Sequence, residues 1–183
     1  ATALIAANCD LISQHADSMG APSACEDANV PNVSYNGSTV ESCPNTFIVA
    51  SRIDWAPYFQ YIVNQVAANE AIATDWTGTI ASGSVVLTDV NEAAAAAGTV
   101  EALADVKAKL EKGEVKVFDT ATEGFITVGG AAMTSYMADV DTDAAFEKDT
   151  EVVADGFFHE SEFRSAPYFD AQIDGIELVN TAF

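Results

Sequence analysis

Basic residues are scarce in this chain of 183 residues. Seven lysines and arginines stand against 28 aspartates and glutamates, which gives a formal net charge of −21. A surface with that balance repels phosphate backbones and anionic lipid headgroups, so neither nucleic acid nor a membrane surface is an expected partner. The charge otherwise favours solubility and carries no information about the fold.

Long apolar runs are missing as well. No stretch of about 18 or more consecutive apolar residues occurs, so no segment is long enough to cross a bilayer. The first residues carry neither a basic region nor a cleavage-site pattern, so we expect no signal peptide and a chain that begins within a fold. Hydrophobic residues nevertheless make up 49% of the sequence, which is enough for a buried core.

Motifs for nucleotide and metal chemistry are also absent. Neither G-x-G-x-x-G nor G-x-x-x-x-G-K-[ST] occurs, which excludes the usual phosphate-binding loops. Cys9, Cys25 and Cys43 lack C-x-x-C spacing, so neither a zinc site nor a disulfide framework is indicated. One disulfide stays open as an alternative, although packing as small hydrophobic side chains is the preferred interpretation.

An acidic segment imitates part of a calcium loop. Asp139, Asp141 and Asp143 stand at alternate positions, as the first ligands of such a loop do. The loop also needs glycine at its sixth position and glutamate at its twelfth, where this chain has Ala144 and Thr150. A solvated acidic turn is therefore the preferred interpretation.

Short apolar runs alternate with segments of helical spacing over the first part of the chain. This alternation predicts an α/β fold with a parallel sheet. The expected strands are 10–14, 33–35, 47–50, 85–87 and 115–118; the expected helices are 1–9, 20–29, 58–69 and 100–112; a hairpin is expected over 125–137 and a strand or extended tail over 173–178.

Polar side chains follow two of the expected strands. His15, Asp17 and Ser18 come directly after strand 10–14, and Asn36 follows strand 33–35. In open parallel sheets, ligands bind beyond the carboxyl ends of the strands, so these residues predict a binding site. The structural alternatives are that Asp17 and Ser18 cap the next helix and that Asn36 belongs to a tight turn.

Three motifs occur in a characteristic order. Residues 10–18 run Asp-Leu-Ile-Ser-Gln-His-Ala-Asp-Ser, residues 33–36 Val-Ser-Tyr-Asn, and residues 55–59 Trp-Ala-Pro-Tyr-Phe. They resemble the D-V-I-x-Q-H-x-D-[ST], I-G-Y-N and W-G-P-Y-Y segments of the basic-membrane-protein (PnrA-like) family of ABC-transporter solute-binding lipoproteins. Looser similarity at 83–87 and 113–118 extends the resemblance over roughly residues 1–118.

The resemblance implies a Rossmann-like lobe of a type I periplasmic-binding-protein fold. Such a lobe has three layers around a mostly parallel sheet, and here it is expected to be truncated at its N-terminus. Residues 1–75 would form the end of the second, C-terminal ligand-binding lobe. Residues 76–90 would be a crossover, and residues 91–183 a return segment associated with the first lobe, with an extended C-terminal tail.

The resemblance also implies a function without catalysis. The family supplies the extracytoplasmic, membrane-anchored lipoprotein of an ABC importer, whose partners are the permease and a purine nucleoside or related small molecule. It implies neither a cofactor nor a metal, and it places Asn36 at a position that binds ribose hydroxyls. The ligand-binding residues implied are His15, Asp17, Ser18, Asn36, Arg52 and Trp55.

Two other functions compete with import. One is a ligand-sensing regulatory domain built on the same lobes. The other is a small hydrolase that uses Cys25 or Asp17, although no third orienting group is apparent for either residue. Separately, an exposed sheet edge favours pairing between copies of the chain, because unpaired strand edges recruit other strands.

Overall fold

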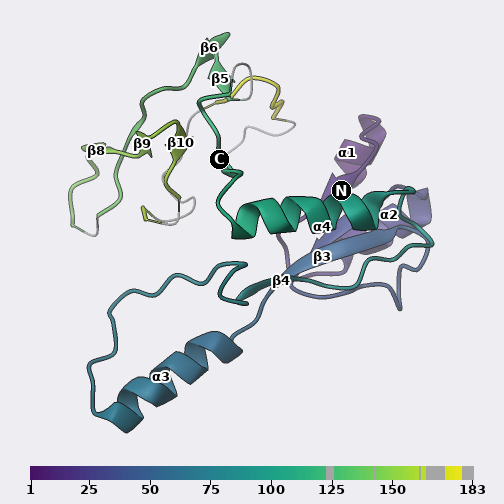
Figure 1. Ribbon diagram of the computed structural model, residues 1–183. Helices are drawn as coiled ribbons and strands as arrows, with labels where there is room; N and C mark the ends of the chain where they lie inside the picture. Colours follow the sequence, from purple (N-terminus) through teal and green to yellow (C-terminus); the bar gives the residue numbers. More distant parts are fainter. Residues whose placement is uncertain (123–125, 142, 161, 164–171, 179–183) are drawn as a thin grey trace. The chain divides into compact units, whose positions relative to one another are not determined.

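The computed structural model describes residues 1–122, 126–141, 143–160, 162–163 and 172–178 (Figure 1). The chain divides into two compact units, Ala1–Glu111 and Lys112–Phe183. The first unit carries a four-stranded sheet with helices, and the second is built from short strand pairs. None of the helices among the described residues has the length and apolar character of a membrane span.

The first unit is a mixed α/β structure with a mostly parallel sheet, as predicted. Its strands are β1 (Ile12–Ser13), β2 (Asn32–Tyr35), β3 (Phe47–Ile53) and β4 (Val85–Leu87), in the spatial order β1-β2-β3-β4. The β1–β2 and β2–β3 pairs are parallel. The order places β1 at one edge and β4 at the other.

The sheet is mostly parallel, and β4 is the strand that departs from the parallel direction favoured by the strand–helix alternation. This strand pairs with β3 in the antiparallel sense. The physical reason is the path of the connection: the backbone N–H of Asp54, just after β3, donates to the carbonyl of Ser84, just before β4, at 2.7 Å. The chain therefore returns to the end of the sheet that it left, which forces β4 to run in the opposite direction.

Four helices complete the first unit, close to where helical spacing predicts them. Asn29 and Asn69 end α2 and α3 in the left-handed conformation, with φ of 53° and 57°, and Pro57 stands in the first turn of α3. The residues of α4 and β4 line a shared apolar pocket of about 190 Å³. The helices are α1 (Thr2–Ala6), α2 (Gly20–Ala28), α3 (Ala56–Ala68) and α4 (Thr99–Glu111).

The sheet buries polar as well as apolar side chains. Asn32 on β2 is fully buried; its side-chain amide donates to the carbonyl of Ile12 on β1 at 2.9 Å and accepts the hydroxyl of Ser34 at 2.6 Å. The hydroxyl oxygens of Ser34 and Thr39 lie 3.2 Å apart. These bonds tie β1 to β2 from inside and extend towards the loop that follows β2.

The described residues of the second unit form three antiparallel strand pairs. The predicted hairpin is confirmed in its turn, where Gly129 and Gly130 have φ of 61° and 80°. Its second strand is Ala131–Ala132, not 133–137, and Phe125 lies outside the described residues. The pairs are β5 (Thr127–Val128) with β6 (Ala131–Ala132), β7 (Met137–Ala138) with β8 (Thr150–Glu151), and β9 (Val153–Ala154) with β10 (Phe157–Phe158).

The predicted strand 115–118 is wrong. These residues form a bend and a turn, and Val115, Val117 and Phe118 are exposed. A strand needs a neighbour, and the contact observed next to this run is the single bridge between Asp119 and Phe157. Residues 173–178 likewise form no strand, and Asp174 and Gly175 lie in a turn.

Candidate functional site

The loop after β1 is fixed by its first residue, Gln14. The backbone N–H of Gln14 donates to the carbonyl of Val33 on β2 at 3.1 Å, which extends the pairing of β1 and β2. The side-chain amide of Gln14 then turns forward along the loop. It donates to the carbonyls of Ala16 at 2.9 Å and Ser18 at 3.2 Å, on either side of Asp17.

The residue after β2 meets this loop. Asn36 has the left-handed conformation, with φ of 63°, which asparagine adopts more readily than most residues. Its backbone N–H donates to the carbonyl of Ser51 on β3 at 2.7 Å, and its side-chain amide makes a long hydrogen bond of 3.5 Å to the carboxylate of Asp17. The two predicted binding loops therefore converge.

A pocket of about 260 Å³ lies where the loops converge. This is just below the lower limit of the size range of small-molecule sites, roughly 300–1,000 Å³. The pocket offers carboxylate, amide and hydroxyl groups, so it suits a polar molecule with several hydrogen-bonding groups. It is lined by Gln14, Ala16, Asp17, Ser18, Met19, Tyr35, Asn36, Gly37, Ser38 and Thr39.

His15 lies beside this pocket with its ring on that of Tyr35. The ring centroids are 4.2 Å apart and the planes are tilted by 31°. Tyr35 lines the pocket, whereas His15 is exposed. The pair brings an aromatic surface next to the polar groups of the loops.

Capping does not account for Ser18 and Asp17. The N-cap residue of α2 is Met19, and no side chain makes a capping hydrogen bond there. Both residues instead line the pocket, and the carbonyl of Ser18 accepts one of the bonds from Gln14. The structural alternative considered for these two residues is thus wrong, because the helix begins one residue later than a Ser18 cap requires.

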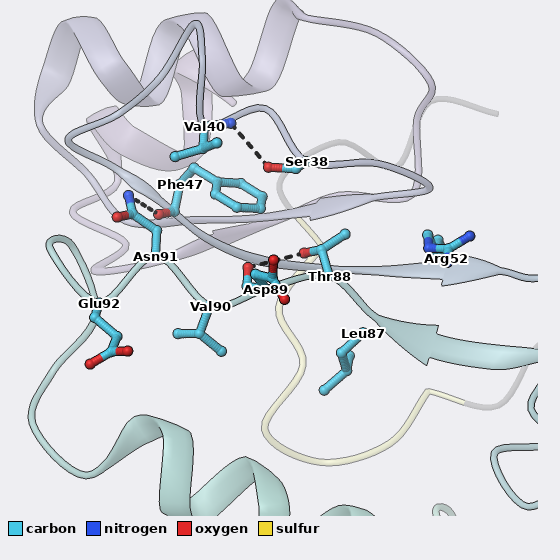
Figure 2. A pocket seen from close by; sticks show the side chains of 10 residues that line it. All are labelled: Ser38, Val40, Phe47, Arg52, Leu87, Thr88, Asp89, Val90, Asn91 and Glu92. Carbon is cyan, nitrogen blue, oxygen red and sulfur yellow. Dashed lines mark hydrogen bonds between the residues drawn. The ribbon is translucent and has the colours of Figure 1, made fainter.

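A second, larger pocket of about 560 Å³ adjoins the first through Ser38, which lines both (Figure 2). The side-chain amide of Asn91 donates to the carbonyls of Pro44 at 2.8 Å and Phe47 at 2.9 Å, which links residues 87–92 of the second pocket to the segment that leads into β3. The pocket is lined by Ser38, Val40, Phe47, Arg52 and residues 87–92.

Arg52 and Trp55, the remaining predicted ligand residues, lie away from the first pocket. Arg52 lines the second pocket and forms an exposed ion pair of 3.7 Å with Asp54. Trp55 is the N-cap residue of α3 and is 56% exposed, with ring centroids 6.3 Å from Tyr58 and 6.4 Å from Phe59. Trp55 lines neither pocket.

Gln14, Ser38 and Thr39 are site residues that the sequence did not single out. The sequence could have indicated Gln14 as a site residue, because it is the polar residue at the end of the expected strand 10–14 and directly precedes His15. Residues 87–92, which line the second pocket, carried none, because their place depends on the antiparallel pairing of β4.

The structure also bears on a catalytic role. Cys25 is fully buried within α2, and desolvation raises the pKa of its thiol, which disfavours the reactive thiolate. Within the part of the chain that the structure describes, no group of three or more His, Cys, Asp or Glu side chains is placed to hold a metal ion.

The described residues thus define a mixed α/β unit with a polar pocket at the carboxyl ends of two parallel strands. No protein-family model matches the chain, and no curated protein matches it in sequence. A solved structure, that of an ABC transporter system solute-binding protein from Conexibacter woesei, is similar with a TM-score of 0.49 and 17% sequence identity. The similarity covers 62% of this chain but only 39% of that protein.

Proposed function

We propose that this chain is the ligand-binding part of a solute-binding protein of an ABC importer, and that its first pocket holds a purine nucleoside or a related small molecule. The observation that carries the proposal is the convergence of Asp17 and Asn36 on one pocket. The resemblance of residues 10–18, 33–36 and 55–59 to the basic-membrane-protein family supports the same assignment.

The chemistry of the pair suits a sugar diol. The ionised carboxylate of Asp17 accepts hydrogen bonds from hydroxyl groups, and the amide of Asn36 both donates and accepts. Two neighbouring hydroxyls of a sugar likewise both donate and accept hydrogen bonds. Asp17 and Asn36 are both exposed in this unit, so in the proposal a second lobe buries them when it closes over the ligand. A ligand without the hydroxyls would then leave these polar groups unpaired, at a cost of about 1–3 kcal/mol for each, which would supply selectivity.

Aromatic surface next to the pair would serve the base of a nucleoside. Tyr35 lines the pocket, and the ring of His15 packs on it at 4.2 Å. Planar bases stack on such rings with offset or tilted geometry. In the proposal, Arg52 extends the site through the second pocket, and exposed Trp55 contacts the ligand when a second lobe closes over it.

The wider assignments belong to this proposal. They are an extracytoplasmic, lipid-anchored location, a permease partner, and the division into a lobe end at 1–75, a crossover at 76–90 and a return segment at 91–183. Pairing of copies at a sheet edge also stays a prediction; β1, the edge strand next to the pocket loops, is only two residues long. A hydrolase using Cys25 has little support, because that thiol is buried.

Calorimetry tests the proposal. The product of the complete gene is titrated with adenosine, guanosine and inosine, and each mixture is also heated to measure the thermal shift. We expect binding heat and stabilisation with at least one nucleoside, and recovery of the nucleoside unchanged. Absence of heat and of any shift with all three overturns the ligand class, and release of a free base would instead indicate a hydrolase.

The control variant is Asn64→Ala. Asn64 is an exposed residue of α3 that accepts a hydrogen bond from Gln60 at 2.9 Å and lines neither pocket. Asp17→Ala should abolish most of the nucleoside binding, whereas Asn64→Ala should leave it unchanged. Equal binding by all three proteins would move the ligand away from the pocket at Asp17.

A further inference from the structure

We propose that Gln14 is a positioning residue of the pocket: its side chain holds the loop after β1 in the shape that presents Asp17 to Asn36. This inference rests on the proposed function, because it assigns a role within the same site. It concerns how the site is held together, which the binding groups themselves do not explain.

The hydrogen bonds of Gln14 are arranged for that role. Its backbone is joined to the sheet through the carbonyl of Val33 at 3.1 Å, so the residue has a fixed base. The two hydrogens of its side-chain amide are directed to the carbonyls of Ala16 and Ser18, at 2.9 and 3.2 Å. These carbonyls bracket Asp17, so one side chain restrains the backbone on both sides of the proposed ligand-binding carboxylate.

The oxygen of the same side-chain amide has no such bonds. The side-chain oxygen of Gln14 is shielded from solvent and has no hydrogen-bond partner among the described residues. A buried acceptor without a donor is costly, and native structures keep few of them. Gln14, which lines the pocket, therefore uses both amide hydrogens to bind the loop, while its side-chain oxygen accepts no hydrogen bond.

A second glutamine provides a matched control. The side-chain amide of Gln65, near the end of α3, donates to the carbonyl of Ala71 at 2.8 Å. It is a glutamine-to-backbone bond of the same kind, and Gln65 lines neither pocket. Loss of such a bond at Gln65 reports on stability alone.

The test uses Gln14→Met and Gln65→Met in the product of the complete gene. Methionine preserves the length of the side chain but removes the amide donors. Affinities for adenosine and for the free base adenine are measured by calorimetry. We expect Gln14→Met to weaken adenosine by about tenfold, or about 1.4 kcal/mol, with a smaller effect on adenine, because Asp17 faces the sugar.

The ratio of the two affinities separates positioning from a structural role. A residue that only stabilises the fold changes both affinities together, as we expect for Gln65→Met. Gln14→Glu is the second variant, because an ionised carboxylate has no hydrogen to donate to the two carbonyls. If either Gln14 variant folds and keeps the wild-type ratio of adenosine to adenine affinity, the inference is overturned.

Backbone NMR order parameters provide a readout that needs no ligand. In the same variants, the order parameters of residues 15–19 should fall in Gln14→Met but not in Gln65→Met, because the loop has lost its restraint. If the wild-type protein binds no nucleoside but this loop loosens, the proposed function fails and the positioning role stands. Unchanged order parameters in the loop overturn the positioning role whatever the ligand.

Discussion

The side-chain nitrogen of Asn36 lies 3.5 Å from a carboxylate oxygen of Asp17, although the two residues are nineteen positions apart in the sequence. Topology produces this contact. Asp17 lies in the loop after β1 and Asn36 directly follows β2, and these two strands are parallel neighbours whose carboxyl ends lie at one edge of the sheet. A right-angled or antiparallel arrangement of the same two strands would separate the pair.

The left-handed backbone at Asn36 leads to a prediction about stability. We expect Asn36→Ala to be less stable than Asn36→Gly by about 1–2 kcal/mol. At φ of 63° the Cβ of alanine lies too close to the backbone carbonyl oxygen, and glycine has no Cβ. Urea unfolding of the two variants measures the difference. Equal stabilities would contradict the left-handed conformation.

The same pair of variants separates backbone from side chain in binding. Both lack the Asn36 amide, so both should weaken nucleosides more than free bases, by about tenfold if one hydrogen bond of about 1.4 kcal/mol is lost. Asn36→Gly, which avoids the strain, is the cleaner of the two for calorimetry. Nucleoside affinity that survives in Asn36→Gly would remove this residue from the site.

Asn32 is expected to matter through the fold and not through the ligand. Asn32→Ala removes one hydrogen bond from the carbonyl of Ile12 and the short hydrogen bond from the hydroxyl of Ser34, both in the buried interior. We expect a loss of about 1–3 kcal/mol in the free energy of unfolding. Asn64→Ala, which removes an exposed bond from Gln60, should cost less than about 0.5 kcal/mol. Similar losses in the two variants would contradict the buried network.

The sequence predicts most of the first unit because its elements are local. Helices ended by Asn29 and Asn69, and apolar runs followed by polar residues, need no knowledge of distant contacts. The loops at His15 and Asn36 could be predicted to converge for a similar reason, since strand–helix alternation alone favours a parallel sheet.

The parts that could not be predicted depend on long-range pairing. The direction of β4 is set by the return of the chain from Asp54 to Ser84, thirty residues later, and the apolar spacing of 85–87 is the same in either direction. The run 115–118 has the composition of a strand, but no strand of the described residues forms a ladder with it. The role of Gln14 depends on where its amide points, which periodicity does not reveal.

In the second unit, one carboxylate is expected to hold the glycine turn of the β5–β6 hairpin. Asp174 accepts the hydroxyl of Thr127 at 2.6 Å and the backbone N–H groups of Gly130 at 2.8 Å and Gly129 at 3.0 Å. Asp174→Ala should therefore speed amide exchange at both glycines while leaving the first unit unchanged. Unaltered exchange at the glycines would contradict this anchoring.

Acid should have the same local effect as that substitution. The hydrogen bond from Thr127, together with those from Gly130 and Gly129, lowers the pKa of Asp174. A lowered pKa gives stability that is present above the unfolded-state pKa of about 3.9 and is lost as the pH falls through the folded-state value. The protection factors of Gly129 and Gly130, which correct for the pH dependence of intrinsic exchange, should thus fall in acid in the wild type but change little in Asp174→Ala.

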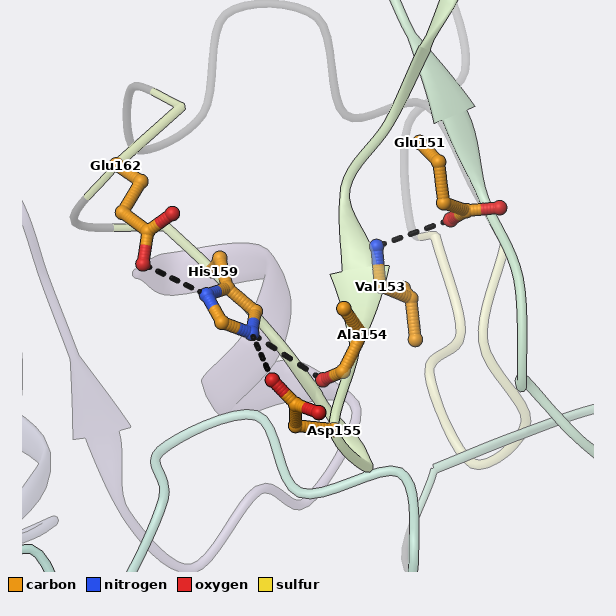
Figure 3. A network of polar contacts seen from close by, with 6 residues as sticks. All are labelled: Glu151, Val153, Ala154, Asp155, His159 and Glu162. Atoms are coloured by element: carbon orange, nitrogen blue, oxygen red, sulfur yellow. Dashed lines mark hydrogen bonds and ion pairs between the residues drawn. The ribbon is translucent and has the colours of Figure 1, made fainter.

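His159 is held by acceptors at both ring nitrogens (Figure 3). Its Nδ1 lies 2.8 Å from the carboxylate of Glu162, and its Nε2 lies 3.2 Å from the carbonyl of Ala154 and 4.0 Å from the carboxylate of Asp155. Only the protonated ring donates from both nitrogens. The ring also stacks on Phe157 at 3.9 Å, and Lys116 lies over that phenyl ring at 4.5 Å.

These contacts predict a loss of stability in alkali. The hydrogen bond to Glu162 raises the pKa of His159, against the opposing effect of desolvation. A raised pKa gives stability that is fully present below the unfolded-state value of about 6.5 and is lost as the pH rises through the higher folded-state value. Thermal unfolding measured from about pH 5 to 9 should therefore show the second unit weakening towards alkaline pH.

Two variants identify the groups responsible. Glu162→Gln removes the carboxylate that favours the protonated ring, so the loss of stability should begin at lower pH than in the wild type. Glu160→Gln removes the same charge two residues away and leaves the His159–Glu162 pair in place, so its profile should follow the wild type. Matching shifts in both variants would assign the effect to net charge, because the specific hydrogen bond differs between them and the charge does not.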